Sequence, residues 1–125
     1  MDVTPLVPKG RQLIQSYGDN GFRISGNRHE GSVWILPEQT LAWPVSAISE
    51  VSPDSLKELL ALSAQHVRIL LIGTGKTMLP VPSSWRAMAR EADVALEPMD
   101  TGAACRTYNV LLTEERSVAA ALIAV

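Results

Sequence analysis

The last eight residues of the chain, 118–125, are all apolar and show no alternation with polar residues. A strand or helix with one face in water would carry polar side chains on that face. An unbroken apolar run is instead typical of a strand that is covered on both faces. We therefore predict that this segment runs through the middle of a sheet that lies between two layers of other elements.

A second apolar run, 67–72, leads into the sequence Gly73-Thr74-Gly75-Lys76-Thr77. This pattern predicts another buried strand that ends in a sharp loop. A helix is expected over 83–92, with its buried stripe at Trp85, Met88, Ala89 and Ala92. A short strand should follow at 94–97 and end at Pro98. Because strand, helix and strand succeed one another, they predict a right-handed parallel crossover.

The first 48 residues are rich in β-branched, aromatic and turn residues. The Gly-Asp-Asn-Gly sequence at 18–21 supplies the positive φ angles of a tight hairpin, so a strand is expected on each side of it. The strands predicted in this part are 13–17, 22–25, 31–36 and 41–45. Residues 1–10, which contain two prolines, are expected to form an irregular lead-in.

Two further helices have recognisable starts. Ser52 precedes Pro53, which combines a capping hydroxyl with a residue whose missing N–H is harmless at a first helical position. This helix should end before His66 and bury Leu56, Leu59, Leu60 and Ser63. Asp100 can cap another helix, ending near Glu115 or Arg116, with an inner face of Ala104, Thr107, Tyr108 and Leu111. Together these elements predict an α/β fold.

Composition limits the class of protein. The 125 residues are 46% hydrophobic and 19% charged, as expected of one globular domain over 1–125. The formal charge of −2 and the absence of a Lys/Arg cluster in the sequence argue against a nucleic-acid partner. The N-terminus lacks the basic and apolar parts of a signal peptide, and no apolar run reaches the ~18 residues that span a bilayer. We expect a cytoplasmic protein without membrane insertion.

The chain contains one cysteine, Cys105, and two histidines, His29 and His66. A single cysteine cannot form an internal disulfide, and this set lacks the ligand spacing of a structural zinc site. We therefore predict a reducing compartment and neither a metal nor a cofactor. Both histidines are expected to be exposed polar residues, and the core is the expected place of Trp34, Trp43 and Trp85.

The glycine loop after the strand at 67–72 fails two phosphate-binding motifs. A P-loop needs a glycine five residues before Gly75, where the sequence has Leu70. The dinucleotide motif would place its third glycine at Met78. Nucleotide binding is therefore the less favoured alternative, and the glycines are better explained by a sharp exit from a buried strand.

Cys105 has two possible roles in the predicted third helix. A position about one turn from the N-terminus would favour the thiolate and make it a nucleophile. Burial beside Tyr108 and Leu112 would make it inert, and this is the favoured alternative because free cysteine is among the most buried residue types.

Charged side chains near the same helix start suggest a ligand crevice. Arg106 and Asn109 lie on the flank of the predicted helix, and with Lys76 and Asp100 they could converge on one end of the sheet. The carboxyl ends of parallel strands are the usual place for a ligand in an open α/β sheet. Equally, Arg106 could pair with a neighbouring acid on a solvated face.

Three segments, 17–26, 70–76 and 99–109, resemble signatures of one family. It is the widespread domain family of unknown function that includes mitochondrial complex I assembly factor 3 and the adipogenesis-associated protein. The resemblance covers about residues 10–125. It implies a three-layer α/β domain around a mixed five-stranded sheet, with helices on both sides and the last strand central and antiparallel to the others. The family has no established catalytic residues, and its eukaryotic relative acts through protein contacts.

Two hypotheses about function remain. The favoured one is a non-enzymatic, assembly-factor-like domain that binds a protein partner, and edge strands in the first half could also pair two copies as a homodimer. The alternative is a small-molecule or anion-binding protein, or an enzyme, that uses a crevice around Lys76, Cys105 and Arg106. Both hypotheses use one predicted surface: Gly73, Thr74, Gly75, Lys76, Asp100, Thr101, Cys105 and Arg106.

Overall fold

The computed structural model describes residues 11–63 and 67–125, so the predicted lead-in at 1–10 and the surroundings of His66 lie outside the described residues. The strands form two sheets. Sheet A is antiparallel and consists of β1 (Ile14–Gly18), β2 (Gly21–Ile24) and β3 (Asn27–Glu30). Sheet B has the strand order β5-β4-β8-β6-β7, with bounds Val33–Leu36 (β4), Gln39–Ala42 (β5), Ile69–Gly73 (β6), Ala95–Met99 (β7) and Val118–Leu122 (β8).

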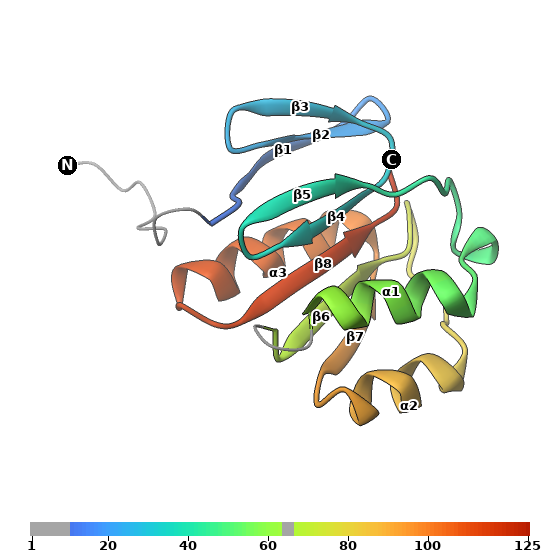
Figure 1. Ribbon diagram of the computed structural model, residues 1–125. Coiled ribbons are helices and arrows are strands. Elements are labelled where there is room, and N and C mark those ends of the chain that lie inside the picture. The colour runs from blue at the N-terminus through green and yellow to red at the C-terminus, as the bar shows by residue number, and fades with distance from the viewer. Residues whose placement is uncertain (1–10, 64–66) are drawn as a thin grey trace.

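Sheet B is the middle of three layers (Figure 1). One of its faces packs against α1 (Pro53–Ser63) and α2 (Ser83–Glu91), and the other packs against α3 (Thr101–Thr113) and sheet A. A short 3-10 turn (Ile48–Glu50) precedes α1. Each face has its own buried apolar cluster, so the predicted three-layer α/β architecture is confirmed.

The C-terminal strand β8 lies in the centre of sheet B, between β4 and β6, and all of its residues are buried. This confirms the position expected from the apolar run. Its expected direction is corrected, because β8 is antiparallel to β4 but parallel to β6, which is itself parallel to β7. The physical reason is that α3 carries the chain back from the end of β7, so β8 starts at the same side as β7 did.

The helices begin close to where their capping residues predict. Ser52 Oγ accepts a hydrogen bond from the backbone N–H of Ser55 at 3.1 Å, which confirms it as the cap of α1. In α2, Trp85 and Ala89 are buried as expected. The buried face of α3 is rotated relative to the prediction, since Thr107 and Leu111 are only half-buried. Its buried residues are Thr101, Ala104, Cys105, Tyr108 and Leu112.

The observed strand boundaries differ from the predictions, most informatively at three strands. Asn27–Glu30, which lies in none of the predicted strands, forms β3, whose side chains are mostly exposed and therefore show no apolar alternation. Strand β5 ends at Ala42, so Trp43 and Val45 lie beyond it. Strand β7 continues through Pro98. Proline is tolerated there because β7 is an edge strand, and the main-chain groups of this position face away from β6.

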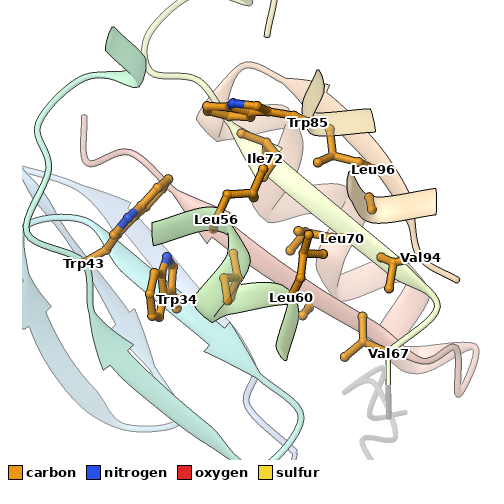
Figure 2. Packing of buried hydrophobic residues seen from close by; sticks show 14 of the residues in the cluster. Trp34, Trp43, Leu56, Leu60, Val67, Leu70, Ile72, Trp85, Val94 and Leu96 are labelled. Atoms are coloured by element: carbon orange, nitrogen blue, oxygen red, sulfur yellow. The ribbon is translucent and has the colours of Figure 1, made fainter. Parts of the chain in front are cut away.

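The three tryptophans belong to the cluster under α1 and α2, as expected (Figure 2). The ring centroids of Trp34 and Trp43 are 6.1 Å apart, with the rings tilted by 41°. Trp43 Nε1 donates to Ser55 Oγ at 3.3 Å, which joins the segment after β5 to α1. Trp85 fixes α2 on the same cluster. The aromatic groups thus hold the two helices on one face of sheet B.

Candidate functional site

The predicted surface centres on the start of α3, where Asp100 caps the helix. Asp100 Oδ1 accepts a hydrogen bond from the backbone N–H of Ala103 at 2.9 Å, as the sequence predicted. The next residue, Thr101, is fully buried, and its hydroxyl donates to the carbonyl of Ile123 at 2.7 Å. The same hydroxyl accepts from the N–H of Gly75 at 3.0 Å. Thr101 therefore joins the glycine loop, the helix start and the end of β8.

The glycine loop is folded back on itself by Thr74. This buried hydroxyl lies 2.8 Å from the carbonyl of Thr77 and accepts from the N–H of Leu79 at 3.0 Å. Gly75 has a φ of +116°, which favours glycine, and its carbonyl accepts from Thr101 N–H at 2.8 Å. At Gly73 an added Cβ would lie 2.9 Å from Thr101 Oγ1, so this position has no room for a side chain.

These contacts bear on the phosphate-binding interpretation of the loop. A phosphate loop leaves successive backbone N–H groups pointing at the ligand. Here the N–H of Thr74 donates to Met99, that of Gly75 to Thr101, and that of Leu79 to Thr74. These three amides therefore hold the loop on its own fold rather than pointing at a ligand, which agrees with the structural role that the spacing favoured.

Cys105 lies on the buried face of α3 and is 2% exposed. Burial disfavours the charged thiolate and raises the pKa of the thiol from 9.0 to about 12, although the nearby positive charge of Arg106 acts in the opposite direction. A thiol with this pKa is almost entirely protonated at neutral pH. Of the two roles left open by the sequence, the geometry therefore favours packing over nucleophilic chemistry.

Arg106 is exposed and contacts a residue that the sequence did not associate with the site. Its guanidinium donates to the hydroxyl of Tyr17, on β1, at 3.1 Å. Tyr17 is 40% exposed and covers the first turn of α3, where a Cβ added at Gly102 would lie 2.7 Å from its hydroxyl. The alternative ion pair of Arg106 with a neighbouring acid is not found among the described residues, whose two ion pairs are Arg28 with Glu30 and Arg68 with Asp93.

A pocket of about 280 Å³ lies between β1 and α3. Its lining includes Cys105 and Arg106 from the predicted surface, but not Lys76 or Asp100; the other lining residues are Ile14, Gln15, Ser16, Tyr17 and Asn109. Lys76 is exposed on the glycine loop. The predicted residues thus share one end of the molecule without lining one common crevice.

Asn109 forms hydrogen bonds with both main-chain groups of Ile14, as a residue of a neighbouring strand would. Its amide donates to the carbonyl of Ile14 at 2.7 Å and accepts from the N–H of Ile14 at 3.1 Å. Tyr108 adds a hydrogen bond from its hydroxyl to the carbonyl of Gln12 at 2.6 Å. Two side chains of α3 therefore form hydrogen bonds with the backbone at the start of sheet A. These bonds fix α3 against β1, the two elements that form the pocket wall.

Comparison with known proteins assigns the family. Residues 14–123 match the family described as "Protein of unknown function (DUF498/DUF598)". The chain belongs to this family. The resemblance found in the sequence is thereby confirmed.

Relatives with curated names include assembly factors. The NADH dehydrogenase [ubiquinone] 1 alpha subcomplex assembly factor 3 of Xenopus tropicalis is 34% identical over 111 residues, which cover 89% of this chain and 60% of that protein. The human protein of the same name is 36% identical, with coverage of 88% and 59%. This chain therefore spans about three fifths of these relatives. An uncharacterized protein of Rhodobacter capsulatus is 38% identical, with coverage of 91% and 86%.

Solved structures of similar proteins share the fold. A crystal structure described as an outer membrane protein from Bartonella henselae is 35% identical and has a TM-score of 0.84, with coverage of 95% of this chain and 98% of that one. An NMR structure of a Rhodopseudomonas palustris protein is also 35% identical, with a TM-score of 0.80 and coverage of 100% and 93%. Within residues 11–63 and 67–125, no helix has the length and apolar character needed to cross a membrane.

Proposed function

We propose that this chain is an assembly-factor-like domain that binds a protein partner and carries out no reaction of its own. The support comes from the relatives named as assembly factors of the NADH dehydrogenase 1 alpha subcomplex, which align with most of this chain. By analogy, the partner is a subunit or an assembly intermediate of an NADH dehydrogenase. A cytoplasmic location and a homodimer remain predictions from the sequence.

The observation that carries the proposal is the pair formed by Tyr17 and Arg106. Tyrosine and arginine are the residue types that, with tryptophan, contribute most strongly to protein interfaces. Here each side chain is held by the other, and the tyrosine rests on Gly102, so less conformational freedom is lost on binding. Lys76, Met78 and Leu79, exposed on the glycine loop, extend the surface with one cationic and two apolar side chains.

The enzymatic alternative receives less support from the same residues. Its nucleophile would be Cys105, whose burial and raised pKa keep the thiol protonated. Its anion-binding pair would be Lys76 and Arg106, and the pocket beside Arg106 is not lined by Lys76. The exposed tyrosine–arginine pair, in contrast, needs no ionised thiol and no closed crevice to act as a contact surface.

Site-specific photo-crosslinking in cells tests the proposal. A photoreactive phenylalanine analogue replaces Tyr17, and a matched control carries it at Glu58, which is exposed on α1 across sheet B. We expect position 17 to crosslink to NADH dehydrogenase subunits, identified by mass spectrometry, and position 58 to give at least tenfold less product. Equal products at both positions, or a second copy of this chain as the sole product at position 17, would contradict the proposal.

A further inference from the structure

A second pocket, of about 490 Å³, lies at the other end of β6 and β7 from the glycine loop. Its walls come from the residue before β6, the exposed side of α2 and the edge strand β7 with the turn that precedes it. The lining residues are Arg68, Arg86, Arg90, Asp93, Val94, Ala95, Leu96 and Glu97. None of them belongs to the surface proposed for the protein partner.

Three guanidinium groups from two separate parts of the chain line this pocket. Arg86 and Arg90 are four residues apart on α2, so they lie on the same side of the helix. Arg68 reaches the pocket from the start of β6. Because Trp85 and Ala89 are buried beneath α2, the helix is fixed to the core, and its two arginines are carried by a rigid element.

One of these arginines is already oriented by the backbone. Arg86 Nη1 donates to the carbonyl of Leu96 at 3.0 Å. The main-chain groups of Leu96 face the outer edge of sheet B, since those of Ala95 and Met99 bond toward β6. A guanidinium has five N–H donors, so most of those on Arg86 remain for another acceptor.

The acidic residues of the pocket do not cancel its positive charge. Asp93 lies 4.0 Å from Arg68, and both side chains are largely exposed, so this ion pair is weak. Glu97, on β7, forms no ion pair with any described residue. With three guanidinium groups against two carboxylates, the pocket keeps a net positive charge, although the whole chain has a formal charge of −2.

We propose that this pocket binds a small molecule through an oxyanion, either a phosphate or a carboxylate group. Arginine suits this chemistry because two parallel N–H groups can contact two oxygens of the same anion. The volume is in the range of small-ligand sites, about 300–1,000 Å³. Arg90 and Arg86 contact the anion from α2, and Arg68 closes the side nearest β6. This site is independent of the surface proposed for the protein partner.

NMR titration of the ¹⁵N-labelled protein tests the site with inorganic phosphate and, in a separate arm, with succinate. Sodium chloride at equal ionic strength corrects for general screening. We expect the backbone amides of residues 94–97 to shift and to saturate with at least one of the two anions. Tighter binding of phosphate assigns a phosphate-bearing ligand, and tighter binding of succinate assigns a carboxylate-bearing one.

Two variants separate a built site from general attraction of anions. Arg90→Gln removes a guanidinium for which no internal hydrogen bond is found among the described residues, so the fold should be retained. The control is Arg23→Gln, on the exposed side of β2, whose guanidinium makes an exposed hydrogen bond to the carbonyl of Gly26. We expect the apparent Kd to rise at least fivefold in the first variant and to change less than twofold in the second. Absence of saturation with both anions, or equal effects of the two variants, would overturn the proposal.

Discussion

At the scale of single residues, Thr101 makes the most demanding contacts of the candidate site. Its hydroxyl is fully buried and joins the N–H of Gly75 to the carbonyl of Ile123. Thr101→Val keeps the shape of the side chain but leaves both groups without this partner. We expect a loss of about 1–3 kcal/mol in the free energy of unfolding, measured by urea denaturation.

The matched control for this substitution is Thr107→Val on the same helix. Thr107 is half-buried, and no hydrogen bond of its hydroxyl is found among the described residues. A change within about 0.5 kcal/mol is expected there. If both variants lost the same stability, the effect would come from valine in the helix rather than from the hydrogen bonds of Thr101.

The sequence predicted some residues of the site and missed others for a physical reason. Asp100 was found because a helix cap is a local signal. The convergence of the glycine loop with the helix start followed from the crossover topology. Tyr17 could not be assigned to the site, because its contact with Arg106 joins residues 89 positions apart. Arg86 and Arg90 have helical spacing in the sequence, but only the fold brings Arg68 beside them.

At the scale of elements, helices and strands were predicted correctly where burial leaves a recognisable pattern of apolar residues in the sequence. The apolar runs of β6 and β8 and the stripes of α1 and α2 each mark a buried surface. Strand β3 has no such mark, since its side chains are mostly exposed. The sequence suggested that strand β7 ends at Pro98, but the strand continues through this residue. It can do so because a missing N–H has no consequence on the outer edge of a sheet.

The packing of α3 against β1 yields a prediction at Gly102. Glycine within a helix usually costs about 0.5–1 kcal/mol relative to alanine. Here a Cβ at this position would lie 2.7 Å from the hydroxyl of Tyr17, so Gly102→Ala must displace that side chain. We expect the substitution to give no gain in stability in the natural sequence and a gain of about 0.5–1 kcal/mol in a Tyr17→Ala background.

A double-mutant cycle on the free energy of unfolding measures this coupling between the two positions. Photo-crosslinking adds a second measurement: the photoreactive residue replaces Arg106 in the Gly102→Ala variant. The yield of crosslinked partner would report whether the displaced tyrosine also weakens the proposed contact surface. An equal gain in both backgrounds would show that Tyr17 does not rest on the helix start.

At the scale of the whole molecule, the central strand is shared by two clusters that differ in chemistry. The side under α1 and α2 contains the three tryptophans. The side under α3 and sheet A contains two buried titratable groups, the Cys105 thiol and the Tyr108 hydroxyl. Burial raises the pKa of both groups, that of Cys105 from 9.0 to about 12 and that of Tyr108 above its usual 10.0. The folded protein should therefore lose stability at alkaline pH.

The sign of this dependence follows from proton binding. Above about pH 9 the unfolded chain loses the thiol proton while the folded protein keeps it, so the free energy of unfolding falls as pH rises. The expected slope is about −1.4 kcal/mol per pH unit for one group, and Tyr108 adds to it above about pH 10. Urea denaturation at intervals from pH 8 to 10.5 measures the slope. Cys105→Ala lowers stability below about pH 9, because buried contacts of the sulfur are lost, and should flatten the curve between pH 9 and 10. An unchanged slope in this variant would contradict burial of the neutral thiol.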